Sequence, residues 1–156
     1  MKKILILTGI IASLAMIGCS SLQLQPADFS WQADEILEIN SKGMVFAKQY
    51  SVAFTVTALL AKEFAADTMA VKNTNEVRLI RDKAGFYYLT GKKFKNVYVL
   101  AQSDGALAVS NTIVISSEKA MDEPKFDQKD SYIELWNGTE KYQLTKGGAM
   151  LLGGKK

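Results

Sequence analysis

The chain has 156 residues, with 19 Lys and Arg residues against 16 Asp and Glu residues, and no histidine. The lack of histidine excludes histidine-dependent catalytic triads, imidazole general bases and the usual zinc and copper sites. The charges nearly balance, so the composition offers no concentrated positive face to nucleic acid. We therefore expect no enzymatic activity, no cofactor, no metal and no nucleic-acid partner.

The first 21 residues have the order of a secretory signal. Lys2 and Lys3 precede an apolar run over 4–17, and Gly18 then precedes Cys19, which is the only cysteine. An apolar run of about fourteen residues is too short to cross a ~30 Å hydrocarbon core comfortably as a helix. The alternatives to a cleaved lipid-bearing signal are an uncleaved anchor, or an ordinary signal that leaves Cys19 as a free thiol.

Residues 14–20, Leu-Ala-Met-Ile-Gly-Cys-Ser, resemble the lipobox of bacterial lipoproteins, with Met16 where that class most often has Leu. The resemblance implies cleavage before Cys19, a diacylglyceryl thioether on its sulfur and an acylated amino terminus. The membrane would then be a partner through acylated Cys19. In Gram-negative lipoproteins an Asp after the cysteine commonly retains the protein at the inner membrane, so Ser20 favours the outer membrane.

We expect a cleaved signal peptide over 1–18, a lipidated tether over 19–28 and a single β-rich domain over 29–156. The tether is short and polar, so the domain should stay near its membrane. Without Lys2 and Lys3 the basic residues fall from 19 to 17 against 16 acidic residues, so the mature chain is close to neutral.

From residue 35 the sequence alternates with a period of two. Residues 35–39 resemble a strand, and 41–43 predict a hairpin connection with Gly43 where positive φ is needed. Residues 44–57 predict one half-buried strand that must bend, bulge or pass between sheets, because about fourteen residues exceed most single strands. Its large side chains share one parity: Met44, Phe46, Tyr50, Val52, Phe54 and Val56.

Residues 58–69 are ambiguous between strand and helix. Leu59, Leu60 and Phe64 have the spacing of a helix face, but the alternation also continues to Leu60. We expect a strand to about Leu60, followed by a short turn or helix near 60–69. Residues 76–82 and 86–89 then predict a hairpin that turns at 83–85.

The second half of the chain carries further hairpin signals. A basic turn at 91–95 leads to a strand at 97–101, and 104–105 predict a hairpin to 106–110, with another strand at 112–116. Residues 117–130, with Pro124 and five acidic residues, predict a non-periodic loop. The turn at 137–138 predicts a hairpin with Glu134 opposite Lys141 and Ile133 opposite Tyr142. A final strand over 149–152 closes or edges the sheet.

These elements predict an all-β, mainly antiparallel fold: a β-sandwich or small barrel of about 8–10 short strands, with one short helix near 60–69.

Two patterns match known chemistry only in part. Ser116 and Lys119 fit Ser-x-x-Lys, in which the lysine activates the serine, but the companion motifs of those enzymes are missing. The predicted loop 117–130 also carries four carboxylates of the kind that can bind calcium: Asp122, Glu123, Asp127 and Asp130. Their spacing does not fit an EF-hand and nearby lysines partly neutralise them, so we interpret these carboxylates as part of a solvated loop. The Ser-x-x-Lys pattern is better interpreted as a chance match.

The segment 86–98 interleaves aromatic and basic side chains. Such a segment could stack on sugars and pair with phosphates in lipopolysaccharide, peptidoglycan or a lipid headgroup. The residues of this envelope contact would be Tyr87, Lys92, Lys93, Lys95 and Tyr98. The simpler interpretation is a hairpin whose aromatic side chains alternate into the core and whose tip carries charge.

The sequence thus predicts an outer-membrane lipoprotein whose β domain is a non-enzymatic accessory, scaffold or interaction module for an envelope protein, glycan or lipid. The alternative is a barrel-like carrier of an apolar ligand or lipid, which the long strand and the aromatic residues suggest. A third class, an envelope hydrolase, is disfavoured by the missing histidine.

Overall fold

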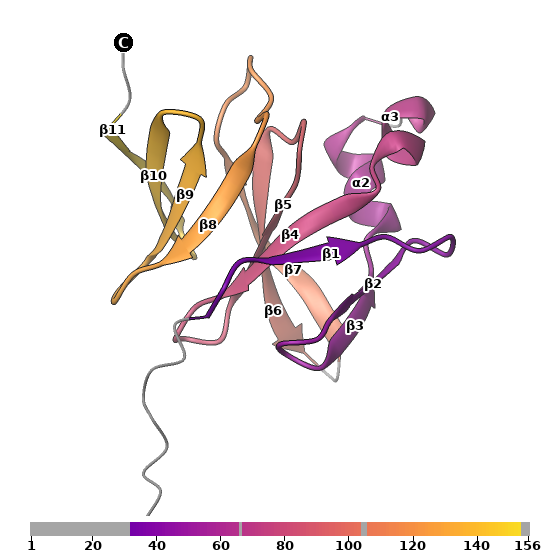
Figure 1. The fold of residues 1–156 in the computed structure, drawn as a ribbon, viewed down its shortest axis with the longest axis horizontal. Coiled ribbons are helices and arrows are strands. Elements are labelled where there is room, and N and C mark those ends of the chain that lie inside the picture. Colours follow the sequence, from indigo (N-terminus) through magenta and orange to yellow (C-terminus); the bar gives the residue numbers. More distant parts are fainter. Residues whose placement is uncertain (1–31, 66, 104–105, 154–156) are drawn as a thin grey trace, which may run out of the picture. The chain divides into compact units, whose positions relative to one another are not determined.

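The computed structural model describes residues 32–65, 67–103 and 106–153. The lipobox, Cys19 and the predicted tether lie outside these residues. The described helices are α2 (Thr57–Glu63) and α3 (Thr68–Asn73), and neither is long and apolar enough to span a membrane. The described strands (Figure 1) are β1 (Glu35–Glu38), β2 (Met44–Ala47), β3 (Val52–Thr55), β4 (Glu76–Arg81), β5 (Tyr87–Thr90), β6 (Asn96–Ser103), β7 (Ala106–Val114), β8 (Pro124–Gln128), β9 (Ile133–Asn137), β10 (Glu140–Thr145) and β11 (Gly148–Gly153).

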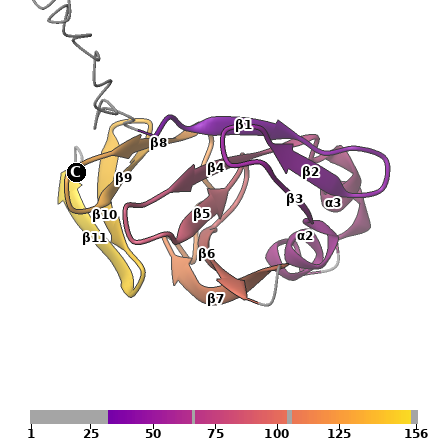
Figure 2. The ribbon, with the colours of Figure 1, turned by 90° about the horizontal axis from the view of Figure 1, so that it is seen from below.

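The strands form three antiparallel sheets. A five-stranded sheet has the order β1-β4-β5-β6-β7, a four-stranded sheet has the order β11-β10-β9-β8, and β2 and β3 form a two-stranded ribbon. The two larger sheets approach each other where β4 meets β8 and where β7 meets β11. Figure 2 shows the four-stranded sheet on one side of β4–β6 and the helices on the other. The all-β prediction is therefore confirmed in a sandwich-like form, and the described strands form no closed barrel.

Strands β5 and β6 are the most deeply buried. All of β5 and residues 97–100 of β6 are buried, which fits their continuous apolar sequence. On one face, Tyr98 bonds to Glu63 of α2, and Tyr87 packs edge-on against Tyr50 with 5.3 Å between the ring centroids. The opposite face turns toward the four-stranded sheet, so these two strands are covered on both sides.

The segment 57–73 forms two helices, whereas we predicted a strand to about Leu60. Helix α2 begins at Thr57, directly after β3, and it buries Leu59 and Leu60 on one face. That burial favours the helical spacing of the two leucines over continued alternation. Helix α3 begins after Asp67, whose side chain accepts hydrogen bonds from the N–H groups of Met69 (3.0 Å) and Ala70 (3.1 Å).

The predicted long strand over 44–57 is wrong. The chain turns at 48–51, and β2 pairs with β3 as a hairpin with Phe46 opposite Ala53. Because the turn changes the parity, β2 buries Val45 and leaves Phe46 55% exposed, opposite to the prediction. Gly43 does take a positive φ of +70°, and a Cβ there would lie 2.1 Å from Thr57 Oγ1. However, β1 pairs with β4 and not with β2.

Two further predictions in the second half are wrong. Residues 106–114 form one strand, β7, with a register shift opposite Val99 and Leu100, instead of two separate strands. The predicted loop 117–130 contains β8, which begins at Pro124 and buries Phe126 and Gln128. Proline is tolerated there because β8 lies at a sheet edge and Pro124 is its first residue.

The β9–β10 hairpin is predicted correctly, but its register is wrong by two residues. Glu134 lies opposite Gln143 and Ile133 opposite Leu144, instead of Lys141 and Tyr142. The turn is made by 138–139, with Gly138 at φ +60°. Because the shift is an even number, every side chain keeps its predicted face, and the fully buried Ile133 and Leu144 meet across the pair.

Candidate functional site

The connection 91–95 between β5 and β6 is held rigidly. The Lys93 N–H donates to the Met121 carbonyl (2.7 Å), and the Met121 N–H donates to the Phe94 carbonyl (2.8 Å). Lys93 takes a positive φ of 66°, and a Cβ on Gly91 would lie 3.0 Å from the Phe94 ring. The tip therefore presents its lysines from a fixed backbone.

The five residues of the predicted envelope contact do not share one surface. Lys92, Lys93 and Lys95 are exposed, as predicted for a charged tip. Tyr87 and Tyr98 are only 3% and 1% exposed, so their rings do not lie beside the lysines where a sugar could stack on them. This burial corrects the aromatic half of the predicted contact, because the alternation of β5 and β6 turns both rings into the core.

Glu63 at the end of α2 binds the start of β6 through three hydrogen bonds. Its Oε2 accepts hydrogen bonds from Tyr98 Oη (2.6 Å) and Asn96 Nδ2 (2.8 Å), and its Oε1 accepts one from the Lys95 N–H (2.5 Å). Glu63 was not among the functional residues predicted from the sequence. No local signal could have found it, because its partners follow 32 to 35 residues later in the chain.

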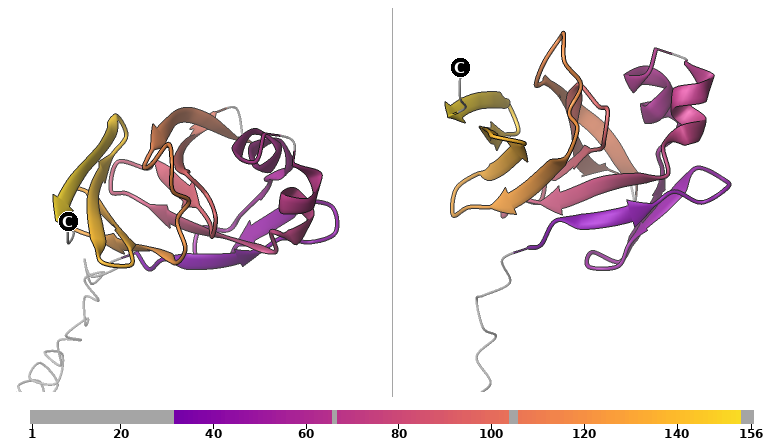
Figure 3. Two further views of the ribbon diagram at one scale, coloured as in Figure 1. Left: turned by 90° about the horizontal axis from the view of Figure 1, so that it is seen from above. Right: turned by 45° about the horizontal axis from the view of Figure 1, so that its top comes forward.

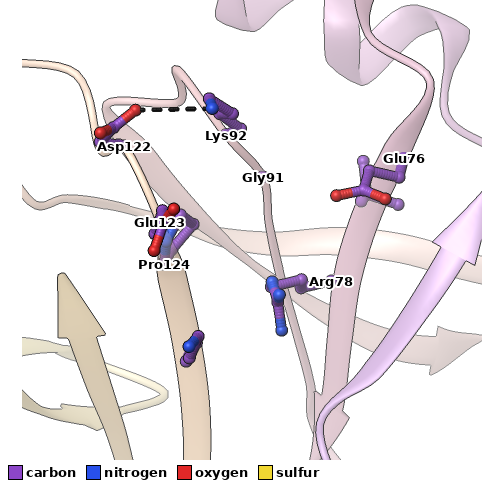
Figure 4. A pocket seen from close by; sticks show the side chains of 9 residues that line it. Glu76, Arg78, Gly91, Lys92, Asp122, Glu123 and Pro124 are labelled. Atoms are coloured by element: carbon purple, nitrogen blue, oxygen red, sulfur yellow. Dashed lines mark ion pairs between the residues drawn. The ribbon is translucent and has the colours of Figure 1, made fainter. Parts of the chain in front are cut away.

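A charged groove runs beside the tip, between β4 and the start of β8. It is a cavity of about 300 Å³, and Figure 4 shows Glu76 and Arg78 on the β4 side with Asp122, Glu123 and Pro124 opposite. We define the charged groove by its six ionisable side chains: Glu76, Arg78, Lys92, Asp122, Glu123 and Lys125. Lys92 Nζ lies 3.7 Å from Asp122 Oδ1 at one end. Both side chains are exposed, so this ion pair adds little to stability.

The groove extends toward the end of α3. A neighbouring cavity of about 340 Å³ shares Glu76 and Lys92 with it and adds Lys93, Asn73 and Asn75. Lys92 therefore lines both cavities, and Lys93 lines the second. Because charged side chains line both cavities, they offer no support for the apolar-ligand carrier.

Arg78 in the groove is fixed from behind by Asp34. Arg78 Nη1 lies 2.5 Å from Asp34 Oδ2, which also accepts a hydrogen bond from the Phe126 N–H (3.2 Å). Burial raises the pKa of the Asp34 carboxyl, and the Arg78 charge offsets part of that effect. Asp34 thus joins the segment before β1 to β4 and to β8, and so helps to set the shape of the groove.

The two other candidate sites from the sequence have ordinary roles in the structure. Ser116 Oγ accepts hydrogen bonds from the N–H groups of Glu118 (3.3 Å) and Lys119 (2.9 Å), as in a local turn, and no contact joins it to the Lys119 amine in the described residues. Asp127 pairs with Lys129 and Asp130 with Lys83. In the described ranges, no group of three or more acidic, cysteine or histidine side chains is placed to hold a metal ion.

The pKa is raised for several tyrosine hydroxyls, among them the half-buried Tyr50 and the buried Tyr88 and Tyr98. Burial raises the pKa of Tyr50 to about 12, although the Arg81 N–H that donates to its hydroxyl (3.1 Å) opposes the shift. Burial, followed by the hydrogen bond to Glu63, raises the pKa of Tyr98. Burial and the carboxylate of Asp82 raise that of Tyr88. At neutral pH these hydroxyls stay protonated, so they make structural hydrogen bonds and are not reactive groups.

We expect the free energy of unfolding to fall as the pH rises from about 10 to about 12. Tyrosine is charged only when deprotonated, and the folded protein holds these protons beyond pH 10.0, where the unfolded chain releases them. The stabilisation is thus complete below pH ~10 and is lost above it. In urea unfolding at about pH 9 and about pH 11.5, Tyr50→Phe should lose less stability than the wild type. An equal loss would contradict the burial of Tyr50.

No protein-family model matches the chain, and neither curated proteins nor solved structures give a significant match.

Proposed function

We propose that the protein is a non-enzymatic, lipid-anchored interaction module of the bacterial cell envelope. The observation that carries this proposal is the position of the only cysteine, Cys19, at the end of a lipobox-like sequence that follows an apolar run. Each buried CH₂ of an acyl chain contributes ~0.8 kcal/mol, so one chain binds only marginally but two or three hold the protein at the membrane. Ser20 after the cysteine favours the outer membrane.

The short stretch of sequence between Cys19 and the described domain supports a role close to the membrane. Gln32, the first described residue, follows Cys19 by 13 positions, and its N–H donates to Gln128 Oε1 of β8 (3.0 Å). Thirteen extended residues span at most ~45 Å. The domain would therefore reach only partners at or near the leaflet that holds its anchor.

The surface that we propose for contact is the charged groove with the exposed lysines of the 91–95 tip. Lys92 lines the charged groove and Lys93 lines the neighbouring cavity, both from a rigid backbone, so little backbone entropy is lost there on binding. Phosphates and carboxylates of envelope glycans or lipids are suitable partners for ammonium groups. The acidic groove residues would add contacts to hydroxyl or amine groups of the same partner.

Replacing Lys92, Lys93 and Lys95 together by Gln should weaken binding to isolated cell-envelope fragments. Exposed charge pairs contribute about 0.2–1 kcal/mol each, so the triple variant should bind roughly 3- to 150-fold more weakly in a co-sedimentation assay. The matched control changes three exposed lysines away from the tip, Lys42, Lys48 and Lys146, to Gln. The contact proposal fails if both triple variants bind like the wild type, or if both lose the same amount.

A further inference from the structure

The outer face of the four-stranded sheet carries a half-buried tryptophan, Trp136. Figure 3 shows this sheet, in orange and yellow, at the end of the domain opposite the helices. Trp136 of β9 lies directly opposite Lys125 of β8 and Lys141 of β10. Directly opposite residues share one face of a sheet, and Lys125 is exposed, so Trp136 belongs to the exposed face. Leu135 and its partner Phe126 are buried on the other face.

Trp136 lines a cavity of about 350 Å³. The other lining residues come from 123–127, which includes most of β8, and from Gly138. Lys141 does not line the cavity, and its Nζ lies 3.6 Å from the centroid of the Trp136 ring. The ammonium thus lies on the side of the ring toward β10, and the cavity lies on the side toward β8. The cavity side of the indole is therefore open to a ligand.

Two unpaired charges stand beside the ring in this cavity. Lys129 pairs with Asp127 and lies 3.8 Å from Glu134 Oε1, so the charge of Asp127 is balanced. Glu123 and Lys125 are exposed, and neither makes an ion pair within the part of the chain that the structure describes. The cavity thus combines an aromatic surface with a carboxylate acceptor and an ammonium donor.

We propose that this cavity binds a neutral sugar ring of a glycan chain, stacked on Trp136. The C–H groups on one face of a pyranose carry partial positive charge and fit the electron-rich face of an aromatic ring. Its hydroxyl groups both donate and accept hydrogen bonds, so they bond to Glu123 and Lys125 together. Trp136 thus takes the stacking role that was predicted for Tyr87 and Tyr98, whose rings are buried.

The lining favours a sugar over other ligands. An apolar chain would cover Glu123 and Lys125 without forming hydrogen bonds to them, which is costly. Glu123 offsets Lys125, and Lys129 offsets Asp127, so the cavity offers no net positive charge to an anionic ligand. A pyranose has an apolar face, a polar rim and no net charge. It therefore matches both the aromatic and the polar part of the lining.

The sugar site adjoins the charged groove, because Glu123 and Lys125 line both cavities. A glycan chain stacked on Trp136 would continue into the groove. The inference rests on the proposed function only for the source of the glycan, which is the cell envelope. A neutral oligosaccharide in solution tests the cavity without the anchor or the tip lysines. The failure of one proposal is therefore distinguishable from the failure of the other.

Fluorescence titration of the full chain tests the stacking. The chain has two tryptophans, so Trp31→Phe leaves Trp136 as the only indole emitter. This variant is solubilised in a detergent without a sugar headgroup and titrated with the β-1,4-linked tetramer of N-acetylglucosamine. We expect a saturable change of the Trp136 emission, because a stacked sugar removes water from the indole. An emission that stays constant up to about 10 mM tetramer would overturn the inference.

Calorimetric titration of variants with the same tetramer tests which residues bind it. Trp136→Ala should weaken binding at least about tenfold, because the stacked area is lost, and Trp136→Phe should lose less. Glu123→Gln changes an exposed side chain and should weaken binding about 2- to 10-fold. It keeps the test decisive even if Trp136→Ala does not fold.

Phe46→Ala is the matched control for the loss of an aromatic side chain. Phe46 is 55% exposed on the β2–β3 ribbon, so this variant should bind the tetramer like the wild type. Equal affinities of the wild type, Trp136→Ala and Glu123→Gln would overturn the sugar site. Equal losses in Trp136→Ala and Phe46→Ala would overturn it as well.

Discussion

Replacing Phe94 by alanine should lower the free energy of unfolding by about 3–5 kcal/mol. The Phe94 side chain is 0% exposed and packs edge-on against Phe64 and Tyr98, with 5.5 and 6.4 Å between ring centroids. Its removal leaves a cavity between α2 and the start of β6, which the surrounding rings can fill only in part. Since a domain of this size is stabilised by only about 5–15 kcal/mol, the effect is large, and equilibrium unfolding in urea measures it.

Phe46→Ala is the matched control for this variant. Phe46 is 55% exposed on the β2–β3 ribbon, so its loss should change the free energy of unfolding by only about 0.5 kcal/mol. If Phe94→Ala were no more destabilising than Phe46→Ala, the packing of the 91–95 tip on α2 would be wrong. The fixed presentation of the tip lysines would then be wrong as well.

Replacing Cys19 by serine should move the protein from the membrane fraction to the soluble fraction of the envelope. Serine lacks the sulfur that would carry the diacylglyceryl group, so no acyl chain remains to bind the bilayer. Fractionation of cells followed by immunoblotting measures the change, with Ser20→Ala as the control that keeps the cysteine. Full retention of Cys19→Ser in the membrane fraction would contradict an anchor at this residue.

The β4–β5 and β9–β10 hairpins were predictable because the glycine signal in their turns is local, whereas the Gly43 turn does not join two paired strands. The 83–85 turn joins β4 to β5 as expected, with Gly85 at φ +92°. The β2–β3 turn has no such signal, since Ser51 takes the left-handed conformation there at φ +53°. Because no glycine marks the turn, the alternation before and after it predicts a single strand.

Strand β8 was missed for a different reason. Its buried positions are Pro124, Phe126 and Gln128, so only one of the three is a typical strand core residue. Its pairing with β9 brings Phe126 opposite the buried Leu135, a contact that only the assembled sheet supplies. Tertiary packing overrides weak local propensity there.

Of the candidate site, only the exposure of the tip lysines was predictable from the sequence. A run of lysines between two apolar strands predicts an exposed tip, and the structure confirms the exposure of Lys92, Lys93 and Lys95. The direction of the Tyr98 ring and its bond to Glu63 depend on where α2 docks, which is a long-range contact. The charged groove likewise forms from β4 and the start of β8, which are distant in sequence.

The intact mass of the protein extracted from its own membranes tests the proposed anchor most directly. We predict a mature chain that begins at Cys19 and carries the added mass of a diacylglyceryl group and an amino-terminal acyl chain. A chain that begins at Met1 and carries no acyl mass would contradict the account.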